Sequence, residues 1–282
     1  MAVVALPLVF SVTNRETGLL AAIIFSGINV GLLLLLWRWV ASNNTAVGDC
    51  IAGSVVTTLL FALLYPSTTA IHCGGSRTEC GNNFKQIILA LHHYHDSHES
   101  LPPAYLTDDN DIPMHSWRVL ILPYLEPGGR YSNYQFDSPW NSDQNLPLAA
   151  TSPEFYRCPL SESPKGETNY LAVVGTETIW PMNNPTKFMD VDDGTANTIA
   201  VVESHASGIL WTEPSDLSFA NMNWQINAEN SRATISSKHP GGAIVAAVDG
   251  SVRFISEKID PEVLQMLTTR RGGEQIESED WW

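Results

Sequence analysis

The distribution of apolar residues divides the chain into an apolar front and a more polar remainder. Residues 17–37, TGLLAAIIFSGINVGLLLLLW, form a run of 21 residues without a charge, close to the ~20 residues that a helix needs to cross a bilayer core. Residues 50–71, CIAGSVVTTLLFALLYPSTTAI, form a second uncharged run. We therefore predict two transmembrane helices, at about 17–38 and 50–70. A buried helix of a soluble domain remains the alternative for the second.

The pattern changes after the second run. Residues 72–80, HCGGSRTEC, are rich in Gly and predict a hinge. From Asn82 onward, apolar residues recur at the three-and-four spacing of one helical face, with Pro102 and Pro103 beyond them as a stop. The residues of this face are Phe84, Ile87, Ile88, Leu91, Tyr94 and His95. We predict an amphipathic helix that leads out of the anchor.

The remainder predicts strands and turns. Strand-like runs occur at 169–175, 197–204, 243–248 and 251–256, and Asp249-Gly250 joins the last two as a tight hairpin. Asp260 and Pro261 predict the start of a final helix, with the glycines at 272–273 as its stop. The segment SWRVLILPYLE at 116–126 could be helix or strand. No strand–helix alternation appears, so the predicted fold class is α+β, with a largely antiparallel sheet.

The charge is distributed unevenly along the chain. Residues 79–282 hold 28 of the 30 acidic residues and only 12 of the 15 Lys and Arg residues. Such an acidic part repels phosphate backbones and anionic lipid headgroups, and no basic cluster offsets it. We therefore expect no nucleic-acid partner.

The chain carries, in order, six segments: ECGNNFKQIILALHHYHDSHESLPPAY, SWRVLILPYLE, YRCPLS, TNYLAVVG, DGTANTIAVVE and HPGGAIVAAVDGSVRFI. Over about residues 60–256 they resemble the motifs of a large bacterial pseudopilin-like family of unknown function, characterised by a His, nine residues and then Asp-Gly. Here these are His239, Asp249 and Gly250. The resemblance implies a pilin-like fold, in which the membrane helix leads through the amphipathic helix into the sheet. It also implies kinship with type II secretion and type IV pilus systems.

The resemblance also bears on processing and topology. A prepilin signal has Gly before the cleavage site and Glu at the fifth mature position. Counting back from Pro66 places Asn44 and Asp49 there, so the signal is degenerate. We expect a permanent membrane anchor at 1–78 and a pseudopilin-like domain with an acidic tail at 79–282. By similarity to pilins, this domain lies outside the cytoplasm of a bacterial cell.

An extracytoplasmic domain can keep disulfides. Cys80 and Cys158 both lie in segments that resemble the family, and the resemblance favours a disulfide between them. Cys73 with Cys80 is the alternative pair, and the absence of any disulfide is the third possibility. Cys50 lies within the predicted second span, as a buried thiol. The spacing of the cysteines shows no zinc signature.

Four of the eight histidines fall within residues 92–98. On a helix, His92, His95 and Asp96 lie three or four residues apart, so they could converge on one metal ion. His95 also belongs to the apolar face, and in the resembled family this stretch ends the helix before a Pro-rich turn. We favour a structural junction over a metal site.

Two other polar motifs, an aspartate-rich loop and His239, also allow a structural interpretation beside a functional one. Asp190, Asp192 and Asp193 lie in a loop that could bind calcium, but full EF-hand spacing is missing, so turn-forming hydrogen bonds are favoured and no cofactor is expected. For His239 we expect a structural role, such as bonding the backbone of the hairpin or loop. No GxSxG, HExxH, Walker or GxGxxG motif occurs, so we expect no enzyme, with an unrecognised hydrolase as the alternative.

Together these observations predict a noncatalytic, membrane-anchored pseudopilin-like envelope protein with a structural or assembly role. Its expected partners are the lipid bilayer and other copies of itself or of pseudopilin-like proteins. The alternative is a cell-surface binding module that recognises calcium, a polysaccharide or an envelope partner.

Overall fold

The computed structural model describes residues 38, 47–129, 132–205, 207–229 and 231–273. The chain divides into two compact units, Met1–Thr69 and Ala70–Trp282. The predicted first membrane segment, about 17–38, lies outside the described residues except for Arg38. Within the described part of the chain, no helix combines the length and the apolar character that crossing a membrane requires. Both membrane segments therefore stay predictions from the sequence.

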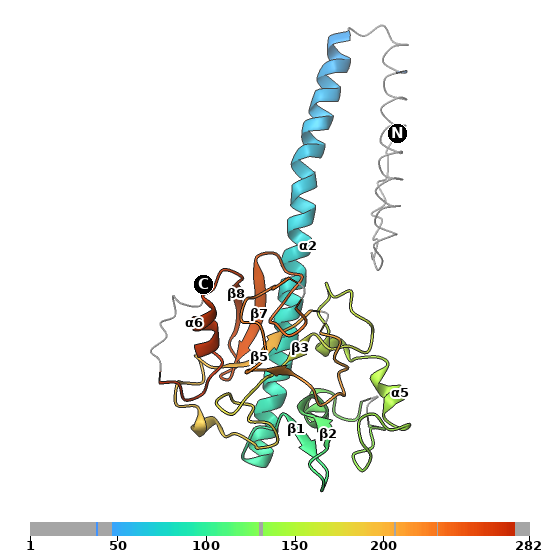
Figure 1. The fold of residues 1–282 in the computed structure, drawn as a ribbon. Helices are drawn as coiled ribbons and strands as arrows, with labels where there is room; N and C mark the ends of the chain where they lie inside the picture. The colour runs from blue at the N-terminus through green and yellow to red at the C-terminus, as the bar shows by residue number, and fades with distance from the viewer. Residues whose placement is uncertain (1–37, 39–46, 130–131, 206, 230, 274–282) are drawn as a thin grey trace. The chain divides into compact units, whose positions relative to one another are not determined.

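The longest element is helix α2 (Val47–His98), which has 52 residues and runs without interruption through Pro66 and the Gly-rich segment 72–80 (Figure 1). The prediction of a hinge at 72–80 and of a helix start at Asn82 is therefore wrong. Glycine tolerates helical dihedral angles at a modest cost, and a long helix is stabilised by packing more than by propensity. The helix ends before Pro102 and Pro103, as predicted.

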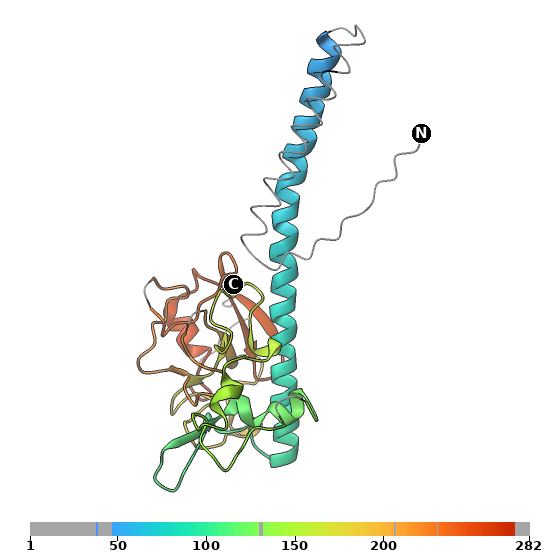
Figure 2. The same cartoon turned by 90° about the vertical axis from the view of Figure 1, so that its right-hand side faces the viewer.

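The predicted apolar face of α2 is confirmed. Phe84, Ile87, Ile88 and Leu91 are each at most 2% exposed, while Lys85 and other polar residues between them face solvent. Figure 2 shows the rest of the second unit along one side of this part of α2. The helix therefore forms one wall of the core rather than a separate stalk at this point.

The central sheet has four strands: β3 (Tyr170–Leu171), β5 (Ile199–Glu203), β7 (Gly242–Ala247) and β8 (Val252–Ser256). Their spatial order is β3-β5-β7-β8, and all three pairings are antiparallel. This confirms the predicted α+β class with a mostly antiparallel sheet. The predicted hairpin is also confirmed: Gly250 adopts a φ of 92° in the turn between β7 and β8, which suits glycine.

Both faces of the inner strands β5 and β7 are buried, which explains the apolar runs in these strands. Ile244 and Ala246 of β7 belong to the core cluster that includes the buried face of α2. The intervening Ala243 and Val245 belong to a second cluster, which contains Leu264. Successive side chains of a strand point to opposite faces, so a strand covered on both sides is apolar at every position.

Smaller elements surround the sheet. The segment 116–126, which could have been helix or strand, is largely helical. The predicted strand at 169–175 divides into β3 and a second short strand, β4, which pairs with a different strand. β1 (Tyr105–Thr107) pairs antiparallel with β2 (Pro113–Ser116), and β4 (Val173–Val174) pairs in parallel with β6 (Leu217–Ser218). The short helices are α3 (Trp117–Leu120), α4 (Leu122–Leu125), α5 (Leu146–Ala149), η1 (Glu154–Tyr156) and η2 (Phe188–Asp190).

The final helix α6 (Pro261–Met266) begins as predicted. The Asp260 side chain accepts a hydrogen bond of 2.8 Å from the backbone N–H of Glu262, so it caps the helix. The helix ends at Met266, several residues before the glycines at 272–273, and the predicted stop is therefore wrong. Arg270 and Gly272, just beyond the helix, hydrogen-bond to other parts of the unit, which favours an irregular path there.

Candidate functional site

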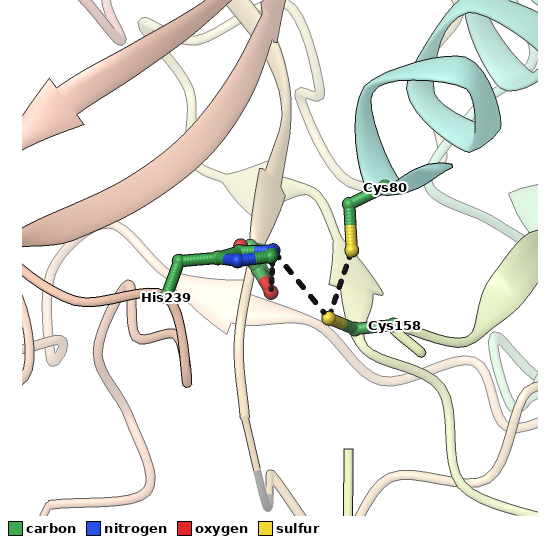
Figure 3. Close-up of side chains that lie close together, drawn as sticks. Cys80, Cys158 and His239 are labelled. Carbon is green, nitrogen blue, oxygen red and sulfur yellow. Dashed lines mark hydrogen bonds and ion pairs between the residues drawn. The ribbon is translucent and has the colours of Figure 1, made fainter. Parts of the chain in front are cut away.

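Four buried side chains that can bind a metal ion or exchange protons meet inside the second unit, and we call them the donor cluster (Figure 3). They come from α2, the segment after η1, the end of β5 and the loop before β7. Their donor atoms all lie within 4.8 Å of one another, and no side chain of the four is more than 4% exposed. The residues are Cys80, Cys158, Glu203 and His239.

Local structure positions three of the four members. Cys80 lies one turn before Phe84 on the buried face of α2. The backbone N–H of Cys158 donates to the side-chain oxygen of Asn169 at 3.0 Å. The Glu203 side chain accepts from the backbone N–H of Ile244 at 3.3 Å, which ties β5 to the neighbouring β7. Elements that are distant in sequence therefore hold the cluster from several sides.

The distances within the donor cluster are short. The Sγ atoms of Cys80 and Cys158 lie 2.8 Å apart. Nε2 of His239 lies 3.7 Å from Sγ of Cys158 and 4.0 Å from Oε1 of Glu203. The other ring nitrogen of His239, Nδ1, is buried without a hydrogen-bond partner. The imidazole edge that carries Nε2 is thus the one turned toward the other donors.

The cysteine pair favoured by the resemblance is brought together, but both residues are free cysteines in the structure. The predicted disulfide between Cys80 and Cys158 is therefore corrected to a contact between two buried thiols. Cys73, the alternative partner of Cys80, has a side chain outside the described part of the structure.

The pKa values in the cluster depend on one another. The hydrogen bond between the sulfurs lowers the pKa of Cys80 to about 6, and the same contact, with burial, raises the pKa of Cys158. Burial raises the pKa of Glu203 to about 7. Burial opposes protonation of His239, but its bond to Cys80 and the charge of Glu203 outweigh this effect and raise its pKa. Protons can therefore be shared among these groups.

The predicted role of His239 is corrected in its detail. We expected its side chain to bond backbone groups of the hairpin or loop, but the imidazole faces the Cys158 sulfur and the Glu203 carboxylate. The two other residues of the motif do shape the hairpin: Asp249 accepts a 2.8 Å hydrogen bond from the backbone N–H of Ser251, and Gly250 provides the positive φ. The His of the motif therefore belongs to the donor cluster, whereas its Asp-Gly forms the hairpin turn.

The histidines at the end of α2 contact other elements of the fold. Nε2 of His92 lies 2.7 Å from the backbone oxygen of Val248. The ring of His95 stacks on Phe188, with centroids 4.0 Å apart and an interplanar angle of 15°. Asp96 is exposed. These contacts match the predicted junction between helix and sheet, rather than three ligands directed at one point.

The three aspartates considered for calcium bond to the segment after α6. Arg271 forms ion pairs of 3.3 Å with Asp190 and with Asp192. Asp193 accepts hydrogen bonds from the backbone N–H groups of Gly272 and Gly273. Their carboxylates therefore connect two loops; turn-forming hydrogen bonds were the favoured role, and the ion pairs with Arg271 were not predicted.

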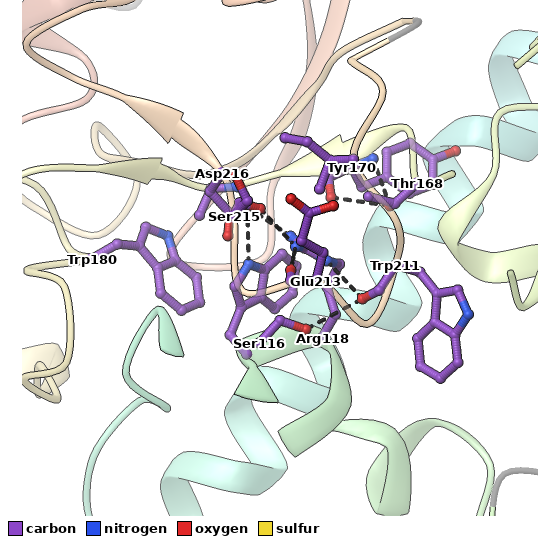
Figure 4. A network of polar contacts seen from close by, with 12 residues as sticks. Ser116, Arg118, Thr168, Tyr170, Trp180, Trp211, Glu213, Ser215 and Asp216 are labelled. Atoms are coloured by element: carbon purple, nitrogen blue, oxygen red, sulfur yellow. Dashed lines mark hydrogen bonds and ion pairs between the residues drawn. The ribbon is translucent and has the colours of Figure 1, made fainter. Parts of the chain in front are cut away.

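A second buried polar group was not predicted at all. Arg118, which is 0% exposed, donates to Asp216 at 2.6 Å and to three backbone carbonyls. Asp216 also accepts from the indole of Trp117 and from the backbone N–H of Ala172. Figure 4 shows this network between α3 and the loop before β6. A lone Arg in the otherwise uncharged run 117–125 was the signal available in the sequence.

Glu203 was also absent from the predicted site. It ends an apolar strand, where a single acid often faces solvent, so its burial could not be read from the local pattern. Only the pairing of β5 with β7 and the position of Cys158 place its carboxylate in the core.

Comparison with known families gives a match to the model described as Protein of unknown function (DUF1559), over residues 76–179 and 208–262. These residues make up more than half of the chain. The chain belongs to this family. The DUF1559 match includes Cys80, Cys158 and His239 but not Glu203, and it does not confirm the specific His-x9-Asp-Gly motif. No curated protein matches the chain, and neither does any solved structure.

Proposed function

We propose that this DUF1559 protein is a noncatalytic, membrane-anchored, pseudopilin-like component of a bacterial envelope, with a structural or assembly role related to type II secretion and type IV pilus systems. The observation that carries the proposal is the architecture of α2. One continuous helix includes the uncharged residues 50–71 and, further along, the apolar face that packs on the antiparallel sheet. A long N-terminal helix packed on an antiparallel sheet is the arrangement that the resemblance to pilins implies.

The membrane anchor is proposed from the sequence. The run 17–37 has the length and the lack of charge that a transmembrane helix needs, and Arg15 and Arg38 stand just outside it. The uncharged residues 50–71 would add a second crossing. The lipid bilayer is then the first partner, and the acidic domain lies outside the cytoplasm.

A structural role also fits the packing of the domain. Its polar clusters are buried: no residue of the donor cluster is more than 4% exposed, and Arg118 donates to three backbone carbonyls besides Asp216. An enzyme needs reactive groups that a substrate can reach. We therefore propose that these groups stabilise the domain rather than catalyse a reaction.

Location is the first test. The full-length chain with a C-terminal epitope is expressed in a bacterial host, and protease is added to intact cells or spheroplasts and, separately, to lysed cells. The proposal predicts that domain fragments are released before lysis, while a cytoplasmic marker stays intact. Fragments that appear only after lysis would refute the extracytoplasmic location and, with it, the pseudopilin-like function.

Self-association is the second test. Chemical cross-linking in membranes, with a reagent that does not react with cysteine, should capture oligomers of the full chain. Replacing the leucines within 59–64 by serine should reduce the yield of these oligomers. Exchanges of exposed residues on α2, such as Lys85→Ser, provide the matched control. An oligomer yield that is independent of 50–66 would contradict assembly through the helix.

A second candidate function is a surface binding module, and one feature favours it. A groove of about 240 Å³ lies between α2 and β8, and its lining includes Arg77, Lys85 and Arg253. Three cationic residues gathered in a domain of net negative charge would attract an acidic ligand such as an anionic polysaccharide. The guanidinium of Arg77 also stacks 3.9 Å above the ring of Phe254, which holds it at the groove.

Binding can be tested separately from assembly. We expect an anionic polysaccharide, for example alginate, to raise the Tm of the full chain if the module hypothesis is right. Lys85→Glu should abolish the shift, and Lys258→Glu, outside the groove, should not. If neither alginate nor calcium changes the Tm, the structural function stands alone.

A further inference from the structure

The donor cluster has features that neither a structural core nor a pair of thiols requires. Its residues come from four separate segments, and Cys80 and Cys158 are 78 positions apart in sequence. All four side chains are at most 4% exposed. Burying several ionisable groups together is unfavourable unless each finds a partner that compensates for lost water.

Protein atoms provide only part of that compensation. The carboxylate of Glu203 accepts a hydrogen bond from the backbone of Ile244, but its Oε1 lies 4.0 Å from Nε2 of His239, beyond hydrogen-bond distance. His239 Nε2 and Cys158 Sγ are 3.7 Å apart. The two sulfurs lie 2.8 Å apart, and all four donors lie within 4.8 Å of one another, close enough to share one ion.

The types of donor are those that zinc prefers. Thiolate sulfur, imidazole nitrogen and carboxylate oxygen bind zinc at about 2.3, 2.0 and 2.1 Å, and structural sites are tetrahedral. Bonds of these lengths place neighbouring ligand atoms about 3.3 to 3.8 Å apart. In the donor cluster all such atoms lie within 4.8 Å of one another. Zinc binding would require the two sulfurs to separate from 2.8 Å by about 1 Å, and the most distant donors to approach one another by a similar amount.

We propose that the donor cluster binds one zinc ion as a closed, structural site. Two thiolates, one carboxylate and one neutral imidazole complete a tetrahedron, and the divalent charge offsets most of the buried negative charge. The site links α2 to the end of β5, to the segment after η1 and to the loop before β7. Zinc thereby fastens the long helix to the sheet. The inference does not depend on the proposed envelope function.

A disulfide is the competing arrangement, and the geometry favours zinc over it. A disulfide would use only Cys80 and Cys158. It would leave Glu203 and His239, 4.0 Å apart, buried beside an uncharged bond to which neither contributes. Zinc binding uses all four donors, so it accounts for the whole cluster.

The first experiment measures metal content. The full-length chain, without a polyhistidine tag, is purified in detergent without chelators, and its metals are quantified by mass spectrometry. We expect about one zinc per chain. Cys80→Ser and His239→Ala should each reduce this content to the background. Cys73→Ser and His93→Ala are the matched controls, because Cys73 lies about 10 Å along the helix from Cys80 and His93 is exposed. Both controls should keep the zinc.

The second experiment avoids the risk that a variant fails to fold. Cobalt(II) is exchanged into the wild-type chain, and tetrahedral thiolate ligation should give an intense sulfur-to-cobalt charge-transfer band with strong visible d–d bands. Zinc should displace the cobalt and remove these bands. Glu203→Gln, which preserves size, should weaken cobalt binding on the order of tenfold or more. Octahedral, weakly absorbing cobalt would overturn the proposal.

The third experiment examines the thiols directly. Membranes are alkylated under denaturing conditions, without reductant, and the tryptic peptides are identified. The proposal predicts that Cys80 and Cys158 are both alkylated, and that in the folded chain they become reactive only after a chelator is added. Two results together would overturn the zinc proposal. The first is recovery of the two peptides joined by a disulfide, and the second is a zinc content below about one-tenth of an equivalent per chain.

Discussion

The imidazole of His92, on α2, lies with its Nε2 2.7 Å from the backbone oxygen of Val248, the residue that follows strand β7. This bond joins the helix to the residue that directly precedes the Asp249-Gly250 turn. The His-rich end of α2 and the hairpin, two of the motifs that carried the family resemblance, are therefore in direct contact. The bond also fixes the ring, since Nε2 must carry the proton that it donates.

Loss of this bond should destabilise the domain. We expect His92→Ala to lower the free energy of unfolding by about 1 kcal/mol, because the Val248 carbonyl loses its partner. His93→Ala, one residue further on an exposed position, should change it by less than about 0.5 kcal/mol. Urea unfolding of the full chain in detergent, followed by Trp fluorescence, measures both. Equal effects of the two substitutions would show that the bond contributes little.

The buried pair of Arg118 and Asp216 should be far more sensitive. Asp216→Asn removes the charge that faces a fully buried guanidinium, and we expect a loss of about 3 to 5 kcal/mol. Asp192→Asn is the matched control, because Asp192 pairs with Arg271 at 3.3 Å but is 67% exposed. Its cost should stay below about 1 kcal/mol. A small effect at Asp216 would mean that water reaches Arg118 in solution.

Burial of His115 predicts a pH dependence. Its ring nitrogens lie 2.9 Å from the hydroxyl of Tyr134 and 2.8 Å from the backbone oxygen of Phe136, and burial lowers the pKa of His115. The unfolded chain then binds a proton near the ordinary pKa of about 6.5, whereas the folded chain binds it only at lower pH. The stability from a neutral His115 is complete above that value and decreases as the pH falls below it.

A difference measurement isolates this effect from the other titrating groups. The free energy of unfolding of the wild type minus that of His115→Gln should decrease between about pH 7.5 and about pH 5. If the His115 difference rises toward acid pH, the imidazole is protonated in the folded state and the assigned direction is wrong.

The continuity of α2 through its Gly-rich segment can be tested with two glycines. Gly75 lies in α2 with open space around its Cα, so Gly75→Ala should stabilise the chain by about 0.5 to 1 kcal/mol. Gly128 has equally open surroundings but a φ of 70°, so Gly128→Ala should destabilise it by roughly 1 kcal/mol. Thermal unfolding compares the two. Destabilisation by Gly75→Ala would restore the hinge at 72–80.

The helical face and the hairpin could be predicted because each depends on neighbours in sequence. The three-and-four spacing from Phe84 to Leu91 identified the buried side of α2, and Asp249-Gly250 identified the turn from backbone preference alone. Asp260 likewise marked the start of α6. Local patterns were insufficient where packing decides the conformation. Gly75 is compatible with either a hinge or a helix, and in the folded structure it lies within α2.

By itself, the sequence determined the α+β class, the apolar face of the helix and the hairpin, and it indicated a family resemblance of which the DUF1559 match supports the family but not the specific motif. Only the tertiary structure decided that Cys80, Cys158, Glu203 and His239 meet in one buried cluster. The same holds for the buried ion pair between Arg118 and Asp216. The physical reason is distance along the chain. Local periodicity reports which side of an element is buried, whereas the partner of a buried polar group depends on how strands and helices far apart in sequence pack together.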